Sequence, residues 1–268
     1  MLRLGLVGHP VAHSRSPLIQ GIFSKSTMIP LQYGLFDVEP PALDTWLAGP
    51  ARALDGFNVT APHKEAVWAA MARLSPEAAR LSPEAARLGA VNTVRPVEGI
   101  WEGHNTDLVG FLALLGTRRP ERALVLGAGG AARAVVAGLA DRGIAVTLAA
   151  RRPEQATALA QALAVAVDVV PFASVPTHLA CALAIDCTQA PEVVALPWER
   201  LPAWGEVLTL SYGASARPLR TAVAAAGRAS TDGLLMLVEQ ARAAFTHWTG
   251  CPVSDLVAQA ALEAAQEV

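Results

Sequence analysis

The sequence offers little that would suit a secreted, membrane-spanning or nucleic-acid-binding protein. Its three cysteines, Cys181, Cys187 and Cys251, are an odd number without metal-ligand spacing, so they indicate a reducing compartment rather than a disulfide framework. No apolar run reaches the length that a membrane span requires. The formal net charge of −2 gives no electrostatic footprint for nucleic acid or an anionic membrane surface. We therefore expect a cytoplasmic protein with neither kind of partner.

Aromatic residues are also scarce, at 5%, although 53% of the chain is hydrophobic and much of that is alanine. This composition favours helix-rich α/β packing over an all-β core. With 268 residues the chain is long enough for two modest domains or one large domain. The N-terminal apolar run Leu2–Val7 is too short for the core of a signal peptide. The six histidines show no H-x-x-E spacing, and the sequence predicts no metal site.

The most informative local pattern lies in the middle of the chain. The apolar run Ala123–Leu126 predicts a buried strand, which Gly127-Ala128-Gly129-Gly130 interrupts. A helical pattern follows over Ala131–Arg142, and Ile144–Ala149 predicts the next strand. A G-x-G-x-x-A motif is weak by itself, because glycine turns join strands to helices in many folds. Between two predicted strands it indicates a dinucleotide-binding βαβ unit.

Each small residue of this turn has a physical role in nucleotide binding. Gly127 permits a tight turn, Gly129 lets the backbone approach a pyrophosphate, and Ala132 allows close packing of helix and strand. Free N–H groups at the helix N-terminus would face the phosphates. The predicted cofactor contacts in this turn are Gly127, Ala128, Gly129, Gly130 and Ala131.

The end of the second predicted strand indicates which nucleotide is bound. An acidic residue there accepts hydrogen bonds from the ribose of NAD, whereas Arg151 and Arg152 follow this strand and the first acid is Glu154. A guanidinium can bind a 2′-phosphate through two charge-assisted hydrogen bonds. NADP is therefore the predicted cofactor, with solvated arginines as the alternative.

Polar residues follow the predicted strands of the N-terminal half. Ser14 and Ser16 precede the helical pattern that starts at Pro17, where they can cap the helix or hold a carboxylate. Lys64 follows a strand end that also carries Asn58 and Thr60. A lysine in that position is commonly solvated, but ligand sites of α/β proteins lie where strands end. Asp107 opens a later helical pattern, where N-capping is its alternative role.

A tandem duplication interrupts this half of the chain. The segment Arg73-Leu-Ser-Pro-Glu-Ala-Ala79 is repeated without change as Arg80-Leu-Ser-Pro-Glu-Ala-Ala86. Seven residues are close to two helical turns, so an insertion of this size would roughly restore the helical face. Each Ser-Pro pair could also start a helix. We interpret one copy as a tolerated local duplication.

Taken together, these segments resemble the shikimate dehydrogenase family. The matching segments occur in family order and span nearly the whole chain. They are Gly8-His-Pro-Val-Ala-His-Ser-Arg-Ser-Pro17, Asn58-Val-Thr-Ala-Pro-His-Lys64, Gly89-Ala-Val-Asn-Thr93, Asn105-Thr-Asp107, Gly127-Ala-Gly-Gly-Ala131 and Asp232-Gly-Leu-Leu-Met-Leu237. The serine pair with N-V-T-x-P-x-K and N-T-D is far more specific than a glycine turn.

The resemblance implies the reversible reduction of 3-dehydroshikimate to shikimate with NADP(H), in aromatic amino-acid biosynthesis. It implies that Lys64 and Asp107 form the catalytic pair. The residues that it implies for substrate binding are Ser14, Ser16, Thr60, Asn92, Tyr212 and Gln240. It adds Leu210 and Gly233 to the cofactor contacts.

The nucleotide half departs from the family pattern at three places. Ala150-Arg151-Arg152 stands where the family has Asn-Arg-Thr, and Asp186-Cys-Thr-Gln189 stands where it has Asn-Ala-Thr-Ser. Thr209 occupies the position of a usual aspartate. The substrate half retains the pattern.

The sequence thus predicts an α/β enzyme with an N-terminal α/β substrate domain and a Rossmann-type dinucleotide-binding domain. The expected limits are 1–105 for the substrate domain, 106–232 for the NADP-binding domain and 233–268 for helices that pack back on the former. The expected partner is a small-molecule substrate, and the expected assembly is a monomer or a homodimer. A relaxed quinate/shikimate dehydrogenase and a non-catalytic ligand-binding homologue are the alternatives.

Overall fold

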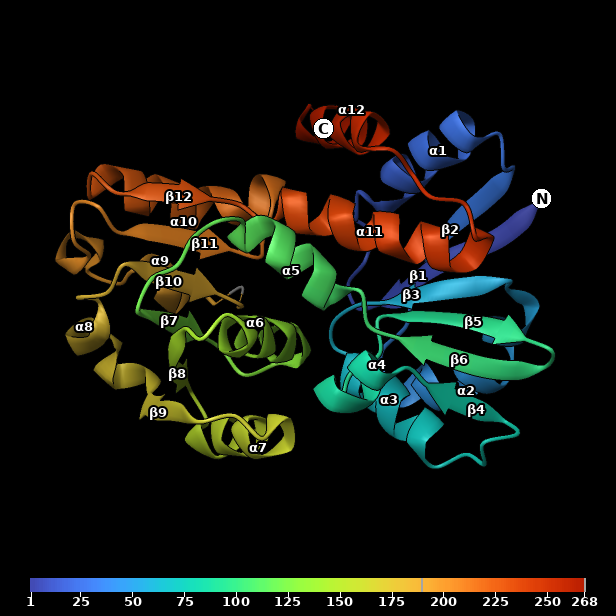
Figure 1. Ribbon diagram of the computed structural model, residues 1–268, viewed down its shortest axis with the longest axis horizontal. Coiled ribbons are helices and arrows are strands. Elements are labelled where there is room, and N and C mark those ends of the chain that lie inside the picture. Colours follow the sequence, from blue (N-terminus) through green and yellow to red (C-terminus); the bar gives the residue numbers. More distant parts are fainter. Residues whose placement is uncertain (189, 268) are drawn as a thin grey trace. The chain divides into compact units, whose positions relative to one another are not determined.

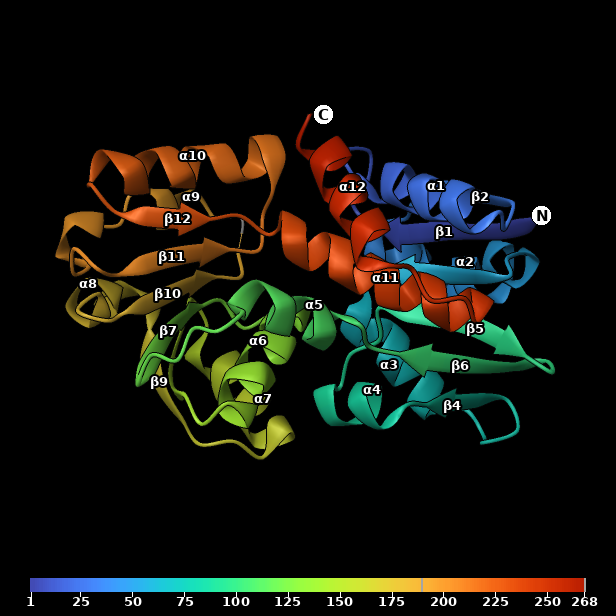
Figure 2. The ribbon, with the colours of Figure 1, turned by 45° about the horizontal axis from the view of Figure 1, so that its top comes forward.

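The structure is a computed structural model that describes residues 1–188 and 190–267, so Gln189 and Val268 lie outside the described residues. The chain forms two compact units. The first unit comprises residues 1–110 and 237–268, and the second comprises residues 111–236. The limits predicted from the sequence, after residues 105 and 232, fall slightly before those of the units. Each unit contains its own six-stranded sheet (Figures 1 and 2).

The sheet of the first unit has the strand order β2-β1-β3-β5-β6-β4. β1 is parallel to both β2 and β3, whereas β5 is antiparallel to β3 and to β6, and β4 is parallel to β6. The strands are β1 (Leu2–Gly8), β2 (Leu31–Asp37), β3 (Gly56–Val59), β4 (Ala79–Leu81), β5 (Thr93–Val97) and β6 (Ile100–His104).

Helices from both ends of the chain cover this sheet. They are α1 (Ser16–Thr27), α2 (Leu43–Ala48), α3 (Lys64–Ala72), α4 (Pro83–Leu88), α12 (Asp255–Gln266) and most of α11 (Leu234–Thr249). Figure 1 shows α12 beside α1, and the two helices are in contact. The indole Nε1 of Trp248 donates to the carbonyl of Val94 at 3.0 Å. A Cβ on Gly56 would lie 2.5 Å from that nitrogen, so this glycine allows α11 to approach the sheet.

Aromatic rings form a continuous series through the core of the first unit. The ring centroids of Phe36 and Trp46 lie 5.4 Å apart, those of Trp46 and Phe57 lie 5.1 Å apart, and those of Phe57 and Trp101 lie 5.5 Å apart. The latter two pairs meet edge to face, the arrangement that the ring quadrupoles favour. Four of the chain's fourteen aromatic residues therefore join α2 to three strands.

The second unit has the strand order β12-β11-β10-β7-β8-β9, with every pair parallel. Numbered within the unit, this is the 3-2-1-4-5-6 order of a Rossmann sheet, with its switch point between β7 and β10. The strands are β7 (Arg122–Leu126), β8 (Ala145–Ala150), β9 (Val167–Pro171), β10 (Leu183–Asp186), β11 (Glu206–Thr209) and β12 (Ala229–Thr231). The predicted fold class is confirmed. β12 was not predicted, because a three-residue Ala-Ser-Thr segment carries no strand pattern.

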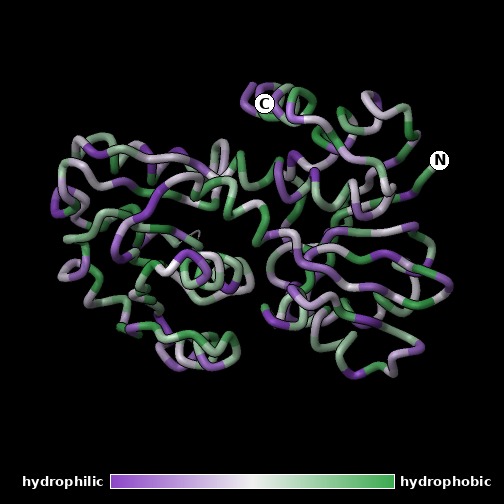
Figure 3. Tube along the Cα trace, in the orientation of Figure 1, coloured by the Kyte–Doolittle hydropathy of each residue, from purple (hydrophilic) through white to green (hydrophobic). Residues whose placement is uncertain are grey.

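Short and long helices alternate with these strands. They are α6 (Gly130–Asp141), α7 (Pro153–Leu163), α8 (Val175–His178), α9 (Pro191–Val194) and α10 (Gly213–Ala225), while α5 (Asp107–Leu115) begins in the first unit and ends in the second. Figure 3 shows hydrophobic and hydrophilic residues interspersed along α6 and α7, as expected of helices with one buried face. Ala132, Val135 and Leu139 are fully buried on α6.

The two copies of the duplication have different structures, so the predicted restoration of a helical face is wrong. The first copy is mostly a turn, and its last residue opens β4. The second copy completes β4 and then starts α4, where the Ser82 hydroxyl accepts from the N–H of Ala85 at 3.1 Å. Pairing of Ala79 with Trp101 on β6 fixes this register. Tertiary pairing has overridden the local preference of identical sequences.

The predicted strand over Gly89–Val94 is only partly correct. α4 ends at Leu88, Gly89 adopts a left-handed φ of 61°, and β5 begins at Thr93. Asn92 therefore lies in the loop before the strand rather than inside it. Among the described residues, no helix is both long and apolar enough to cross a membrane.

Candidate active site

Strand directions in the first unit bring the predicted catalytic residues to one edge of its sheet. β1 and β3 are parallel and end there, and β5, antiparallel to β3, begins there. β6 returns to the same edge because it is antiparallel to β5. Lys64 follows β3, Asn92 precedes β5, and Asp107 follows β6. This topology explains why residues far apart in the sequence meet.

Lys64 and Asp107 form a close ion pair. The Lys64 ammonium donates to Oδ2 of Asp107 at 2.6 Å, and the two side chains are 14% and 5% exposed. Lys64 is the first residue of α3, and its carbonyl accepts from the N–H of Val91 at 3.0 Å. A solvated lysine, the alternative, is therefore excluded by the burial of its side chain.

Asn92 connects this pair to its surroundings. Its Nδ2 donates to Oδ1 of Asp107 at 2.9 Å and to the hydroxyl of Thr106 at 3.0 Å. Its Oδ1 accepts from the N–H of Thr106 at 2.8 Å. Oε1 of Gln240, on α11, lies 3.5 Å from Nδ2 of Asn92. The structure thus brings together Lys64, Asn92, Asp107 and Gln240 of the predicted set.

The Asn105-Thr106-Asp107 segment is held by its own first residue. Nδ2 of Asn105 donates to the carbonyl of Ala90 at 2.9 Å, and its Oδ1 accepts from the N–H of Asp107 at 2.9 Å. Asn105 therefore takes the capping role that was the alternative for Asp107. Both carboxylate oxygens of Asp107 remain directed at Lys64 and Asn92.

The side chain of Asn58 is buried and forms hydrogen bonds to the residues of this network. It is 4% exposed, and its Nδ2 donates to the carbonyl of Asn92 and to the hydroxyl of Thr93, both at 3.0 Å. The hydroxyl of Tyr33 donates to its Oδ1 at 2.7 Å. Nothing in the sequence links Tyr33 to this site, because the contact depends on the pairing of β1 with β2 and β3.

The serine pair lies at the start of α1 in a different position from the one expected. α1 begins at Ser16, so Arg15 is the N-cap residue and the predicted cap at Ser16 is wrong. The Ser14 hydroxyl accepts from the N–H of Ser16 at 3.2 Å and donates to its hydroxyl oxygen at 3.1 Å. The two hydroxyls are therefore adjacent at a helix N-terminus. Thr60, half-buried, follows β3 and donates its N–H to the carbonyl of Val7 at 2.9 Å.

The glycine turn of the second unit lies at the switch point of its sheet. Gly127 follows β7 with a φ of 103°, in the left-handed region that favours glycine. A Cβ there would lie 2.5 Å from Cγ2 of Thr188, which follows β10. Gly129 precedes α6 in extended backbone, with open space where a Cβ would be. Within the described part of the chain, no side chain caps α6.

Arg151 and Arg152 lie where the sequence places them. β8 ends at Ala150, both arginines are exposed, and Arg152 is the residue before α7. β8 is hydrogen-bonded to β7 in parallel register, so its carboxyl end lies at the same edge as the glycine turn. Glu154, the first acid, already lies in α7.

A buried carboxylate lies at the carboxyl end of β10. Asp186 is 4% exposed, and its Oδ2 accepts from the hydroxyl of Thr209 at 3.0 Å. Oδ1 accepts from the hydroxyl and the N–H of Thr188, at 2.7 and 2.9 Å. Burial raises the pKa of Asp186, while these hydrogen bonds act in the opposite direction. Burial also raises the pKa of the neighbouring Cys187 thiol well above its usual value.

The remaining predicted contacts of this unit follow β11 and β12. The N–H of Gly233 donates to the carbonyl of Ser211 at 2.9 Å, and a Cβ on Gly233 would lie 2.2 Å from the carbonyl oxygen of Leu210. Only glycine fits there without a backbone shift. Tyr212, half-buried, is the residue before α10 and belongs to the second unit, unlike the other predicted substrate contacts.

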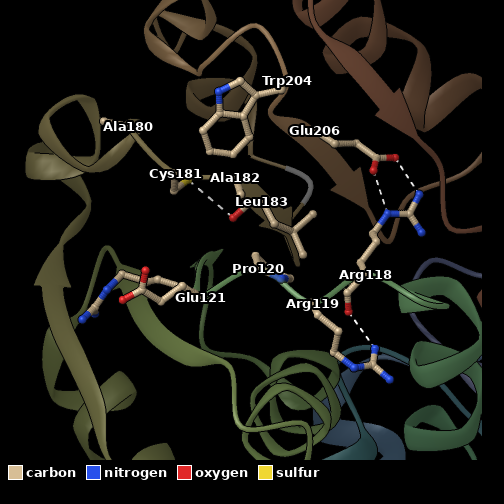
Figure 4. A pocket seen from close by; sticks show the side chains of 11 residues that line it. Arg118, Arg119, Pro120, Glu121, Ala180, Cys181, Ala182, Leu183, Trp204 and Glu206 are labelled. Carbon is tan, nitrogen blue, oxygen red and sulfur yellow. Dashed lines mark hydrogen bonds and ion pairs between the residues drawn. The ribbon is translucent and has the colours of Figure 1, made fainter.

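A cavity of about 580 Å³ lies at the opposite edge of the second sheet, where the strands begin. Figure 4 shows the indole of Trp204 on one side and the fork of Arg118 directed at the carboxylate of Glu206. The two bonds of this fork are 2.6 and 2.8 Å long. Because ligands of Rossmann sheets bind at the carboxyl ends of the strands, this cavity is separate from the nucleotide edge.

The strand order and the glycine turn place the second unit among the dinucleotide-binding α/β proteins. Models of known protein families that match this chain identify its family. A model described as the shikimate dehydrogenase substrate binding domain matches residues 6–94, and one described as shikimate / quinate 5-dehydrogenase matches residues 113–197. A third, the shikimate 5'-dehydrogenase C-terminal domain, matches residues 233–263.

Named relatives agree with these models over almost the whole chain. The shikimate dehydrogenase (NADP(+)) of Methylobacterium radiotolerans is 42% identical over 268 residues, covering 92% of this chain and 91% of that protein. The enzyme of the same name from Thermus thermophilus is 40% identical over 263 residues, covering 93% of each. The chain belongs to the shikimate dehydrogenase family.

Solved structures of the family are similar along the full length. A shikimate 5-dehydrogenase of Thermus thermophilus, in complex with NADP(H) and shikimate, gives a TM-score of 0.80 at 36% identity and covers 99% of this chain and 100% of its own. The shikimate dehydrogenase of Mycobacterium tuberculosis gives 0.83 at 30% identity, covering 98% of this chain and 100% of its own.

Proposed function

We propose that the protein is an NADP-dependent shikimate dehydrogenase that reversibly reduces 3-dehydroshikimate to shikimate in aromatic amino-acid biosynthesis. The observation that carries this proposal is the buried Lys64–Asp107 pair, 2.6 Å apart, at the end of the strands. Relatives with this name at about 40% identity support the substrate and the cofactor.

The pair can perform the proton chemistry of the reaction. When bound, the nicotinamide supplies or accepts a hydride at the reacting carbon. Reduction of a ketone leaves a developing alkoxide, which the Lys64 ammonium can stabilise and protonate. In the reverse direction, neutral Lys64 accepts the proton of the hydroxyl. Asp107 fixes the position of the ammonium through the 2.6 Å hydrogen bond.

Asp107 is itself prepared for this role. Its Oδ1 accepts from Asn92 at 2.9 Å and its N–H is held by Asn105, so its carboxylate cannot turn away from Lys64 without losing hydrogen bonds. Fixed donors and charges stabilise a transition state without further reorganisation. Asn92 thus positions Asp107 by its hydrogen bond, and its amide also lies beside the catalytic pair.

We propose that the other predicted residues recognise the substrate by its polar groups. The adjacent hydroxyls of Ser14 and Ser16, at the start of α1, suit a carboxylate. Thr60, Asn92, Tyr212 and Gln240 offer neutral hydrogen-bonding groups for the ring hydroxyls. A site that hydrogen-bonds a hydroxyl strongly rejects analogues that lack it, because its own buried groups would then be unpaired.

The residues of the second unit fit NADP. Gly127 adopts the left-handed backbone of the turn, Gly129 leaves open space beside it, and the uncapped start of α6 presents N–H groups to phosphates. Arg151 and Arg152 are exposed at the end of β8, where a 2′-phosphate would be bound. Ala128, Gly130 and Ala131 complete the turn, and Leu210 and Gly233 offer backbone at the end of β11.

An NADP(H)-linked absorbance assay on the purified protein tests the proposal. We expect turnover with shikimate and NADP, and a much lower catalytic efficiency with quinate. Comparable efficiencies would establish the relaxed quinate/shikimate dehydrogenase. Shikimate binding without turnover would establish the non-catalytic homologue, although retention of both Lys64 and Asp107 favours a catalyst.

A further inference from the structure

A cluster of two histidines and a glutamate in the first unit has no role in the proposed reaction. Glu102 and His104 are two residues apart on β6, so they share a face of the sheet. His247 lies on α11, and its ring centroid is 3.5 Å from that of His104. One ring nitrogen of each histidine and one carboxylate oxygen of Glu102 lie within 4.8 Å of one another.

The elements that carry these residues are fixed to each other. Nη1 of Arg95, on β5, donates to the carbonyl of His247 at 2.7 Å. The next residue, Trp248, donates to the carbonyl of Val94 at 3.0 Å. β5 and β6 are paired in antiparallel register, with Arg95 opposite Glu102. These contacts hold β5, β6 and α11 together without using the side chains of Glu102, His104 and His247.

Atoms of the cluster have lone pairs that could bind a ligand. Arg95 donates to Glu102 through Nε and Nη2, but both bonds, of 3.0 and 2.9 Å, fall on Oε2. Nε2 of His104 lies 4.0 Å from that oxygen, beyond hydrogen-bonding distance. Nε2 of His247 is buried and has no hydrogen-bond partner among the described residues. A buried nitrogen without a partner is costly unless something binds it.

We propose that Glu102, His104 and His247 form a binding site for Zn²⁺. Two imidazoles and a carboxylate are a common protein ligand set for zinc, with water in the fourth position. Mg²⁺ and Ca²⁺ prefer oxygen ligands and would not compete. The ion would join β6 to α11, and the positive charge of Arg95 would be balanced by its bond to Oε2 of Glu102. The proposal is independent of the proposed function.

The test is a calorimetric titration of the untagged, EDTA-treated protein with Zn²⁺, with Mg²⁺ as the comparison metal. We expect saturable binding of one Zn²⁺ per chain, no binding of Mg²⁺, and a melting temperature raised by roughly 5 °C at a hundredfold excess over Kd. Co²⁺ in place of zinc should give the intense visible absorption of a four-coordinate site.

Two variants and one control locate the site. Glu102→Gln and His247→Leu should each weaken Zn²⁺ binding by at least the roughly tenfold loss that removal of an outer-shell partner causes. His178→Leu removes a half-buried histidine of the second unit and should leave the affinity unchanged. Circular dichroism verifies that each variant is folded. Glu102→Gln keeps the shape of the side chain, so it remains informative if His247→Leu does not fold.

Three results would overturn the proposal. They are the absence of saturable binding by the wild type, equal Zn²⁺ affinity in Glu102→Gln and the wild type, and an affinity that falls only in His178→Leu. A variant that melts at a lower temperature but binds Zn²⁺ as the wild type does would assign the two rings a packing role instead.

Discussion

At the residue scale, the chain offers a simple test of its proposed catalytic group. It contains only two lysines, Lys25 and Lys64. Lys25 lies in the last turn of α1, where a cation interacts favourably with the helix dipole. Lys64 is instead held by Asp107 beside Asn92. Any property that needs a buried ammonium therefore depends on one position.

Replacement of Lys64 should reduce turnover far more than binding. In Lys64→Ala, we expect kcat for shikimate oxidation to fall by about 10²–10⁴-fold, because proton transfer and alkoxide stabilisation act in the transition state. The Michaelis constant should change by a much smaller factor. Steady-state kinetics with Lys25→Ala as the matched control measures both. Near-normal turnover in Lys64→Ala would refute the assigned role.

Arg151 should determine the preference for NADP over NAD. In Arg151→Ala, we expect the catalytic efficiency with NADP to fall by about 10–100-fold, the equivalent of losing a charge-assisted hydrogen bond of about 1.5–3 kcal/mol. Efficiency with NAD should be nearly unchanged, because NAD has no 2′-phosphate. Arg217→Ala, which removes an exposed arginine from α10, is the control. A preference for NADP that survives the loss of both Arg151 and Arg152 would contradict this assignment.

Asp186 should make the stability of the protein depend on pH. Because burial raises its pKa in the folded state, the folded protein holds this proton more tightly than the unfolded chain. The stabilisation is complete below the unfolded pKa of about 3.9 and is lost as pH rises through the folded pKa.

Asp186→Asn removes this dependence while keeping the shape of the side chain and one of its two accepting oxygens. The variant should melt at a higher temperature than the wild type near pH 8, and the difference should shrink toward about pH 4. Thermal melts across this range measure the effect, with Asp168→Asn, on the edge strand β9, as the control. A variant less stable than the wild type at high pH would show that the hydrogen bonds of the carboxylate outweigh its burial.

At the element scale, the duplication separates local preference from context. Ser75 and Ser82 occupy the same position in identical seven-residue segments. Only Ser82 caps a helix, and it does so because β4 pairs with β6 immediately before it. The hydroxyl of Ser75 instead bonds to the exposed carboxylate of Glu77 and lowers its pKa.

The matched pair Ser82→Ala and Ser75→Ala should therefore differ in stability. Loss of the cap in Ser82→Ala should cost about 1 kcal/mol, whereas Ser75→Ala should have a clearly smaller effect. Urea denaturation of the two variants and the wild type measures the difference. Equal losses would mean that the first copy also starts a helix in solution.

Element types were predictable where the local pattern was strong. β7, the glycine turn, α6 and β8 were expected within a residue or two, because apolar runs, glycines and an alanine-rich helix all agree there. β12 and the start of β5 were not, since their positions depend on pairing. All the predicted substrate contacts, the catalytic pair and the cofactor contacts stay predictions as ligands, although the structure shows their surroundings.

At the scale of the whole molecule, the two units have different sheets and different expected ligands. The mixed sheet of the first unit carries Lys64, Asp107 and the serine pair, while the parallel sheet of the second carries the glycine turn and Arg151. Each ligand should therefore stabilise its own set of backbone amides.

Hydrogen–deuterium exchange can test this division. NADP should slow exchange most at residues 127–133, in the second unit, and shikimate should do so at residues 14–16 and 105–107, in the first. Binding lowers the population of locally open states only where the ligand contacts the folded form. A peptide from α7, beyond Arg152, is an internal reference. Protection by NADP confined to the first unit would refute the assignment of the cofactor contacts.

The sequence by itself determined the fold class, the glycine turn and the segments of the site. Strand and helix periods, turn glycines and short polar motifs are local properties, so they can be recognised without knowledge of what packs against them. The N-T-D segment and Lys64 are recognisable in the same way, since the former directly follows β6 and the latter follows β3 after a short loop.

Only the tertiary structure decided what depends on pairing between distant segments. Identical copies of one seven-residue segment became a turn and a strand–helix junction, because β4 pairs with β6 across the boundary between the copies. Glu102, His104 and His247 have no recognisable spacing, yet antiparallel pairing and the packing of α11 bring their ligand atoms within 4.8 Å. Spacing along a chain cannot reveal such a cluster, because strand pairing and helix packing bring its residues together.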